Sequence, residues 1–268
     1  MLASSAVKEF ALANKIPVSS PEKLSNSEVV SQIQNLIPDF VVIASYGKLV
    51  PEAIFKAAKI APLNVHPSLL PKYRGASPIQ RAILEGDKQT GVSIAEVTKD
   101  LDAGDLFAQR EIQIEPNENT GELSQRLSLV ASRLILEVME QLTTGKAKKI
   151  PQDSSAFTYA KKIEKEEGKI DWNTSNVLIH NQVRAYFPWP GAYTFLGRKR
   201  LKVIATEIDG SGLKIKPGAI LEIKPSYISV QTKNGFLLLK QVQLEGKKEM
   251  SAYDFALGQR LKPGDLFQ

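Results

Sequence analysis

Three side chains in this sequence have the types and spacing that proton chemistry needs. Asn64 and His66 are two residues apart in a short apolar stretch, so on a β-strand their side chains point the same way. Imidazole exchanges a proton near neutral pH, and a carboxylate such as that of Asp102 can orient the imidazole or accept a proton. Each residue alone is more often structural, and it is their combination that indicates a site.

The elements around these residues predict where the site lies. Residues 63–66 are expected to form a strand, and a proline-rich loop leads from it to a helix over 77–84. An uninterrupted apolar run at 40–46 is typical of a parallel strand that is covered on both faces. The other predicted elements are helices at 4–14, 26–36, 51–59 and 120–142 and strands at 90–97 and 106–114. Strands that alternate with helices predict a parallel or mixed α/β sheet, whose chemistry lies at the carboxyl ends of strands.

The second part of the chain has a different pattern. After one helix at 173–186, short strand-like runs recur, with turns such as Gly210-Ser211-Gly212 and Asn234-Gly235 between them. All of the net charge of +6 lies here, since residues 1–150 hold 17 Lys and Arg against 17 Asp and Glu, and the remainder holds 18 against 12. The pattern predicts a small barrel that meets a polyanion, and a merely solubilising surface is an equal alternative.

The composition excludes several kinds of site. The 268-residue chain has no cysteine, and therefore no disulfide, thiolate metal site or cysteine nucleophile. The two histidines, His66 and His180, are too few and too far apart in sequence to indicate a zinc site. No apolar run is long enough for a transmembrane helix, so we expect no membrane partner.

Taken together, the motifs resemble those of folate-dependent formyltransferases, and within that family the branch that acts on methionyl-tRNA. The resemblance consists of Asn64-x-His66, Ser68-Leu69-Leu70-Pro71-x-Tyr73-Arg74-Gly75-x-x-Pro78, Gly91-Val92-Ser93, Asp102-x-Gly104-Asp105, Ile170-Asp171-Trp172 and Pro188-Trp189-Pro190-Gly191. It extends over nearly the whole chain. It implies a Rossmann-like catalytic domain at 1–145, a linker at 146–160 and an OB-like, tRNA-binding β-barrel at 161–268.

The resemblance also implies a reaction. A formyl group would pass from 10-formyltetrahydrofolate, a co-substrate, to the α-amine of methionyl-initiator tRNA, with no metal. The amine is the nucleophile, Asn64 would donate a hydrogen bond to the oxyanion, and His66 would hold charge or shuttle a proton. Asp102 would orient His66 and accept the amine proton, while Gly104 would let the loop approach the substrate closely. We expect a cytoplasmic monomer whose partner is this tRNA.

Binding residues follow from the same resemblance. The predicted folate contacts are Ser68, Leu69, Leu70 and Pro71 of one loop and Ala44, Tyr46 and Gly47 at the end of the preceding strand. Tyr73 and Arg74 would border the acceptor, unless Arg74 only fixes its loop. The predicted tRNA contacts are Lys146, Lys148, Lys149, Lys161, Lys162, Arg198, Lys199 and Arg200. Trp172 and the cluster of Pro188, Trp189 and Pro190 are expected to be core and domain-joining residues rather than base-stacking ones.

The chain departs from the family's pattern at its start. It lacks the strand, helix, second strand and basic loop that usually come first, so we expect an exposed strand edge and exposed apolar surface. One alternative is therefore an inactive, truncated tRNA-binding fragment. Another is a sugar-nucleotide formyltransferase or a formyltetrahydrofolate hydrolase. The sequence Pro78-Ile79-Gln80-Arg81 and the basic second part favour the tRNA enzyme.

Overall fold

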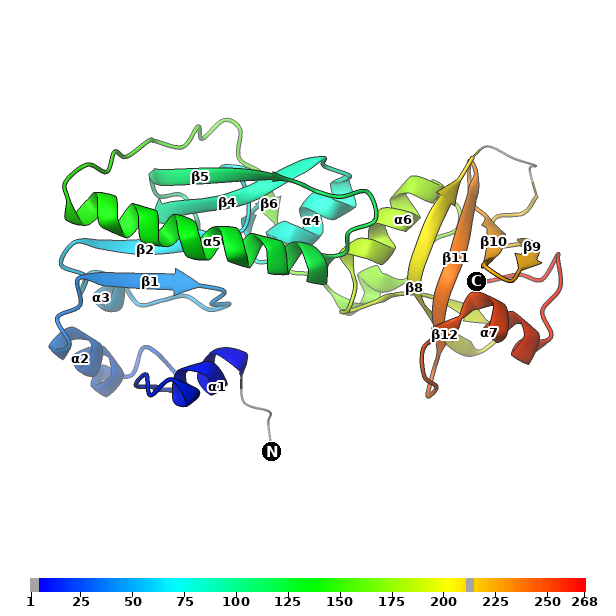
Figure 1. Cartoon of the computed structure of the whole chain (residues 1–268), viewed down its shortest axis with the longest axis horizontal. Helices are drawn as coiled ribbons and strands as arrows, with labels where there is room; N and C mark the ends of the chain where they lie inside the picture. Colours follow the sequence, from blue (N-terminus) through cyan, green and yellow to red (C-terminus); the bar gives the residue numbers. More distant parts are fainter. Residues whose placement is uncertain (1–4, 211–214) are drawn as a thin grey trace. The chain divides into compact units, whose positions relative to one another are not determined.

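The computed structural model describes residues 5–210 and 215–268, and its chain forms two compact units (Figure 1). The first unit contains the chain up to residue 42 together with residues 46–62, and the second contains residues 43–45 and 63–268. Most of the predicted turn at 210–212 lies outside the described residues. Among the described residues no helix is long and apolar enough to cross a membrane.

The first unit is built from short helices. Its elements are α1 (Ala6–Ala13), α2 (Ser27–Asn35), the first part of β1 (Phe40–Ala44) and α3 (Glu52–Phe55). Side-chain oxygens of Ser5 and Asn26 accept the first free amides of α1 and α2, which is why these helices begin where they do. Neither helix buries a residue, and Phe10 is exposed, as expected from the sequence. Helix α3 is shorter than predicted.

A four-stranded sheet carries the polar residues of the candidate site. Its strand order is β1, β2 (Ala61–His66), β4 (Gln89–Glu96) and β5 (Leu106–Gln113). The pairs β2–β4 and β4–β5 are antiparallel, so this part of the predicted parallel or mixed sheet is antiparallel. The prediction that β1 is covered on both faces is wrong, because β1 ends the strand order and Val42 is 44% exposed.

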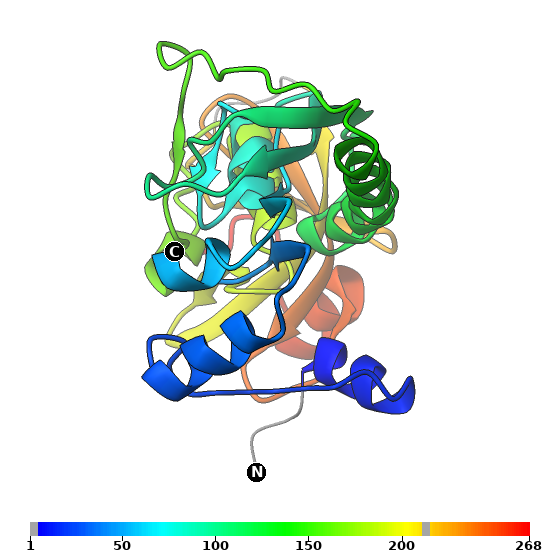
Figure 2. The same cartoon turned by 90° about the vertical axis from the view of Figure 1, so that its left-hand side faces the viewer.

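Two helices pack beside this sheet. Helix α5 (Thr120–Thr143) contacts β4 and β5, and α4 (Pro78–Glu85) contacts α5 (Figures 1 and 2). A capping box between Asn119 and Glu122 starts α5. The apolar face of α5 was predicted from its helical spacing, and Leu123, Leu127, Leu134 and Val138 of that face are buried. This helix therefore gives the sheet one apolar cover.

An antiparallel sheet dominates the second part of the chain. Its strands are β7 (Ala192–Leu196), β8 (Lys199–Asp209), β11 (Phe236–Leu244), β10 (Tyr227–Gln231) and β9 (Ile220–Lys224) in spatial order, with β12 (Met250–Ser251) beside β11. Its other elements are β6 (Tyr159–Ala160), the short helix η1 (Lys165–Gly168), α6 (Asn176–Ala185) and α7 (Ala252–Gln259). Strand β6 pairs in parallel with β3 (Arg74–Gly75). The helix predicted at 173–186 corresponds to α6, and the short strands predicted after it correspond to β7, β8, β9, β10 and β11.

The C-terminal residues join the two edges of this sheet. The backbone N–H and carbonyl of Gln268 bond Phe195 on edge strand β7. Phe267 donates to Gly218, and Ile220 of edge strand β9 donates to Asp265. The C-terminal segment thus forms backbone hydrogen bonds with both edge strands, β7 and β9. This agrees with the small barrel expected from the sequence.

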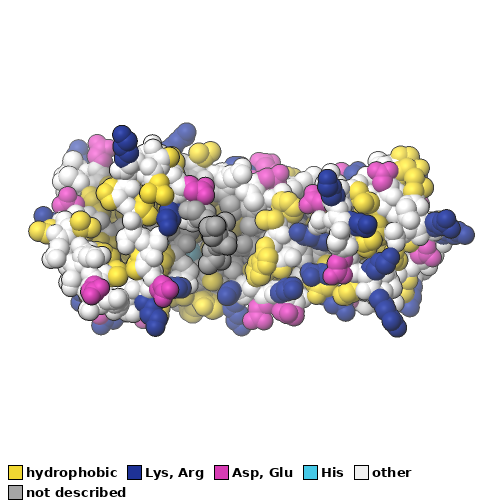
Figure 3. Space-filling view, turned by 90° about the horizontal axis from the view of Figure 1, so that it is seen from below, with side chains coloured by type: hydrophobic (Ala, Val, Ile, Leu, Met, Phe, Trp, Pro, Cys, Tyr) yellow, Lys and Arg dark blue, Asp and Glu magenta, His cyan; other side chains and the backbone are white. Residues whose placement is uncertain are grey.

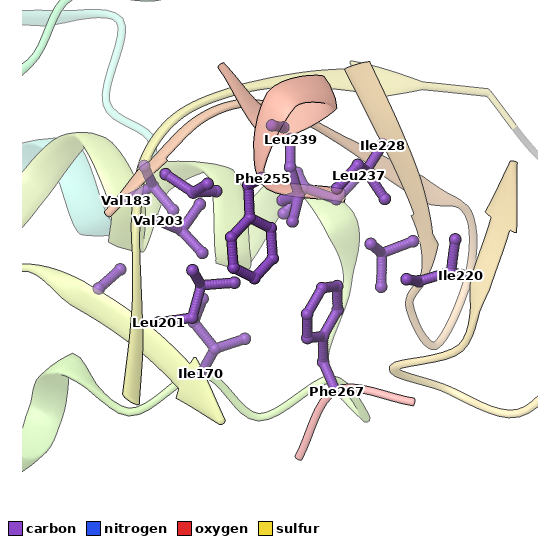
Figure 4. Close-up of a cluster of buried hydrophobic side chains, with 14 of the residues drawn as sticks. Ile170, Val183, Leu201, Val203, Ile220, Ile228, Leu237, Leu239, Phe255 and Phe267 are labelled. Atoms are coloured by element: carbon purple, nitrogen blue, oxygen red, sulfur yellow. The ribbon is translucent and has the colours of Figure 1, made fainter. Parts of the chain in front are cut away.

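The core of this sheet lies between its strands, α6, α7 and the C-terminal segment (Figure 4). Trp172 is buried there, where its indole N–H donates to Thr194 at 3.0 Å and its ring stacks on Phe267 at 6.1 Å. Its predicted core role is confirmed. The same prediction is wrong for Trp189, which is 57% exposed because it lies in the connection between α6 and β7, outside both elements.

Helix α6 joins the two halves of the second unit, the half with the candidate site and the half with the antiparallel sheet, because it contacts α4 in the first and β8 in the second. Its His180 is buried, with Nδ1 2.9 Å from the hydroxyl of Thr206 and Nε2 3.4 Å from the carbonyl of Pro116. Burial lowers the pKa of His180, and the nearby Arg184 guanidinium lowers it further. Elsewhere at this junction, Arg81 of α4 forms two hydrogen bonds to Glu167 of η1.

We expect His180 to make stability depend on pH. The folded state favours neutral imidazole, so the unfolded chain binds more protons as pH falls below the usual histidine pKa of about 6.5. The free energy of unfolding should therefore decrease from pH of about 7.5 to about 5.5. Urea denaturation of the wild type and of His180→Gln measures this, and the variant should show a smaller difference. An equal difference in both proteins would contradict the assignment.

Candidate active site

Strand β2 presents Asn64 and His66 on one face, as their spacing predicted. Asn64 stands opposite Ala95 and His66 opposite Ser93 in the antiparallel register with β4. His66 ends the strand and is 5% exposed. Its imidazole is thereby fixed by the sheet at the point where the chain enters the next loop.

Asp102 joins these two residues from the loop between β4 and β5. One carboxylate oxygen accepts the side-chain amide of Asn64 at 2.8 Å, and the other accepts the backbone N–H of Gly75 at 2.8 Å. The second oxygen also lies 3.6 Å from His66 Nδ1. Charge-assisted bonds of this kind are strong in a site as enclosed as this one. The structure therefore brings the three predicted residues together.

The hydrogen bonds determine which nitrogen of His66 carries a proton. Its Nε2 lies 2.9 Å from the carbonyl oxygen of Tyr73. A carbonyl only accepts, so Nε2 must donate, and the proton state of Nδ1 is left to its surroundings. Nδ1 is the nitrogen that faces Asp102, and it is therefore the one available for proton transfer.

Two glycines shape the approach of this loop. A Cβ on Gly104 would lie 1.9 Å from the carbonyl oxygen of Glu96, so only glycine lets the loop pack on the end of β4. The close approach of Gly104 is thus to the protein's own backbone. Gly75, whose amide binds Asp102, has a φ of +116° that disfavours other residues, and its missing Cβ makes room for Tyr159 and Ala160.

The loop predicted to contact folate is hydrogen-bonded to side chains of β4 and β5. Ser93 donates to the carbonyl of Ser68 and accepts the N–H of Leu70, and Gln109 donates to the carbonyl of Leu70. Ser68 and Leu70 are buried, and the hydroxyl of Ser68 donates to Lys72. Leu69 and Pro71 are only partly buried. The other predicted contacts lie around the end of β1, with Ala44 in the second unit and Tyr46 and Gly47 in the first.

The side chains predicted on the acceptor side are bound within the protein. The phenol of Tyr73 donates to Asp87 at 2.8 Å, and burial together with this bond raises its pKa far above the usual range. Arg74 donates twice to Gln152 and lies over the ring of Phe157. Arg74 is therefore bonded to Gln152, and its role beside the acceptor stays a prediction.

Some of the predicted tRNA-contacting side chains have a partner within the protein, and others do not among the described contacts. Lys149 is paired with Glu96 at 2.7 Å, and Arg200 lies 3.7 Å above the ring of Tyr193. The side chains without such partners among the described contacts are exposed: Lys146, Lys148, Lys161, Lys162, Arg198 and Lys199. Figure 3 shows Lys and Arg side chains gathered on the half of the molecule that holds the antiparallel sheet. Among the described residues, no cluster of histidine and acidic side chains could hold a metal ion.

One residue that contacts the candidate site was missed by the sequence analysis. Gln152, in the predicted linker, donates from Nε2 to the carbonyls of Asp102 at 2.9 Å and Gly104 at 2.6 Å. It lies far from the site in sequence and belongs to no motif, so no pattern indicated it. The contribution of the Gly75 amide was missed for a different reason, since backbone donors carry no residue-type pattern.

Comparison with known proteins places this site in a family. Residues 2–139 match the formyl transferase family, and residues 162–260 match the C-terminal domain of formyl transferases. Methionyl-tRNA formyltransferases of Sulfurihydrogenibium sp. and Dictyoglomus turgidum are 42% and 44% identical to the chain. Each alignment covers 98% of this chain and 85% of the relative.

Solved structures agree on the fold. HypX from Aquifex aeolicus in complex with tetrahydrofolic acid superposes with a TM-score of 0.66 at 20% identity, over 85% of this chain and 40% of that one. The N-formyltransferase from Helicobacter canadensis superposes with a TM-score of 0.65 at 18% identity, over 90% and 85% of the two chains. The chain belongs to the formyltransferase family. Its place within that family is with the methionyl-tRNA formyltransferases.

We predict that Gly104→Ala destabilises the protein, because the new Cβ must displace either the Asp102 loop or the end of β4. Overpacking of this kind costs about 1–3 kcal/mol. Urea unfolding measures the change. Gly258→Ala is the matched control, since its Cβ meets no atom within 4 Å in helix α7 and should stabilise by about 0.5–1 kcal/mol. A Gly104→Ala variant as stable as wild type would show that the loop has room to move.

Proposed function

We propose that this chain transfers a formyl group from 10-formyltetrahydrofolate to the α-amine of methionine on initiator tRNA. The observation that carries the proposal is the grouping of Asn64, His66 and Asp102 at the end of β2, where Asn64 donates a hydrogen bond to Asp102 and His66 Nδ1 lies 3.6 Å from the same carboxylate. The relatives at 42% and 44% identity are named methionyl-tRNA formyltransferases, which supports formyl transfer as the reaction and methionyl-tRNA as the acceptor.

Asn64 is suited to stabilise the oxyanion. When the amine attacks the formyl carbon, the carbonyl oxygen becomes negatively charged and needs a donor already in place. The amide of Asn64 has two N–H groups, and Asp102 accepts one of them. The bond to Asp102 orients the amide, and the second N–H is left to donate to the oxyanion.

His66 and Asp102 are suited to move the proton. The amine nitrogen gains a bond to carbon and loses one proton, while the bond from the formyl carbon to N10 breaks and N10 takes up one proton. His66 Nδ1 and Asp102 face each other at 3.6 Å, so either can receive the amine proton directly or through water. The bond from Nε2 to Tyr73 keeps the imidazole in this orientation.

The substrates would meet at this end of the sheet. We propose that Leu69, Pro71 and Ala44 of the second unit contact the folate, while Ser68 and Leu70 hold the loop from inside. The exposed cations of the second part, Arg198 and Lys199 among them, would contact tRNA phosphates. The excess of positive charge in residues 151–268, 18 Lys and Arg against 12 Asp and Glu, supports this role.

We expect Asp102→Asn to abolish most activity. The variant keeps the size of the side chain and loses the charge that binds Gly75 and faces His66, so kcat should fall by roughly 10²–10⁴ with little change in KM. Formyl transfer from 10-formyltetrahydrofolate to methionyl-initiator tRNA is the assay, with the exposed Asp39→Asn as the control that retains activity.

Other outcomes of this assay identify the alternatives. Formate release without an acceptor would indicate a hydrolase, and transfer to an amino sugar nucleotide alone would indicate a sugar formyltransferase. Absence of any transfer with salt-sensitive tRNA binding would indicate an inactive binding fragment.

The tRNA interface has its own prediction. Replacing both Arg198 and Lys199 by alanine should weaken tRNA binding and reduce the slope of log Kd against log salt by about 2, one for each phosphate that is no longer neutralised. Filter binding at several salt concentrations measures the slope. Arg110→Ala is the control, because that arginine is paired with Glu137 at 3.0 Å and is not among the predicted tRNA contacts, and its slope should match the wild type. Equal slopes for all three proteins would place the interface elsewhere.

A further inference from the structure

The backbone of Asp102 is held in an unfavourable conformation. Its φ of +50° lies in the left-handed region, which a residue with a side chain adopts at a cost. Its two carboxylate oxygens nevertheless point at defined partners, Asn64 on one side and Gly75 on the other. Something outside the loop must therefore hold it in place.

Gln152 supplies that contact. Its single amide group donates to the carbonyls on both sides of the Asp102–Gly104 turn, at 2.9 Å and 2.6 Å. Because both hydrogens of the amide are used, the side chain cannot rotate without breaking a bond. The turn that carries the carboxylate is thus bound directly to the linker.

Gln152 is itself fixed from the other side. Its Oε1 accepts two bonds from the guanidinium of Arg74, at 3.1 Å and 2.7 Å. Arg74 precedes Gly75, whose amide binds the Asp102 carboxylate, and its backbone pairs with Tyr159 of the same linker. Gln152 therefore connects the turn that carries the Asp102 carboxylate to Arg74, the neighbour of Gly75 in the chain.

The linker also binds the residue that holds His66. The hydroxyl of Thr158 accepts the N–H of Tyr73, and the carbonyl of Tyr73 accepts His66 Nε2. Near its start, Ile150 exchanges two backbone hydrogen bonds with Leu106, just after the Asp102 loop. Residues 150–160 thus contact both segments that position the acid–base pair.

We propose that Gln152 is a positioning residue for Asp102, and that it sets the carboxylate against Asn64 and His66 through the backbone of the loop. This inference rests on the proposed function for its kinetic consequence. It assigns to the linker a part in catalysis as well as in joining the two halves of the chain. Misplacing a catalytic group by about 1 Å can cost about 100-fold in rate.

The test compares two glutamines whose side-chain amides each donate to two backbone carbonyls. Gln182 also donates to two carbonyls, those of Glu167 and Lys169, at a place without contact to Asn64, His66 or Asp102. Gln152→Leu should lower kcat about 10- to 100-fold with KM for both substrates unchanged. Gln182→Leu should leave kcat within about twofold, as expected for a structural bond outside the site. Equal losses in both variants would overturn the proposal.

Two further variants separate positioning from folding. Gln152→Glu keeps the acceptor for Arg74 and loses both donated bonds, so it should be as slow as Gln152→Leu, and rescue by glutamate would overturn the proposal. In an Asp102→Ala background, Gln152→Leu should cost nothing more, because the group it positions is gone. A further loss of equal size there would assign Gln152 a role independent of Asp102.

One readout does not depend on turnover. With only two histidines in the chain, imidazole NMR signals are assigned by comparison with His180→Gln. Gln152→Leu should move the signals of His66 and leave those of His180 unchanged, and an unmoved His66 would contradict the proposal. A wild type without formyl transfer would overturn the proposed function while this measurement still decides the role of Gln152.

Discussion

The Asp102 carboxylate is the group on which the rest of the site depends. It accepts bonds from a strand side chain, Asn64, and from a loop amide, Gly75, and it faces His66 from a third segment. These segments are separate in the sequence, so no interaction between near neighbours in the chain brings them together. A charge placed in so enclosed a position requires donors around it, and the fold supplies them from β2 and from the loop that follows it.

Most of the family motif serves this arrangement from inside the protein. Ser68 and Leu70 are buried under their own loop, Tyr73 is bonded to Asp87, and Arg74 is bonded to Gln152. Rigid support of this kind keeps reacting groups in place without reorganisation during the reaction.

The two halves of the second unit are also connected by hydrogen bonds within the protein. The linker contacts the site through Gln152 and Thr158. Helix α6 adds a second connection, because its His180 contacts both Thr206 and Pro116. The antiparallel sheet domain is thus bonded to the segments that form the site. Its core is closed by the chain's last residues, since Phe267 is buried in it and Gln268 bonds β7.

Sequence alone determined the local features of this protein. The two-residue period placed Asn64 and His66 on one face, and the helical spacing of its apolar residues placed the buried face of α5, because these effects act between near neighbours. Only the tertiary structure decided that β2, β4 and β5 pair antiparallel, that Trp189 is exposed, and that Gln152 binds the Asp102 loop. Those outcomes depend on contacts between residues distant in the chain, for which residue type and spacing carry no information.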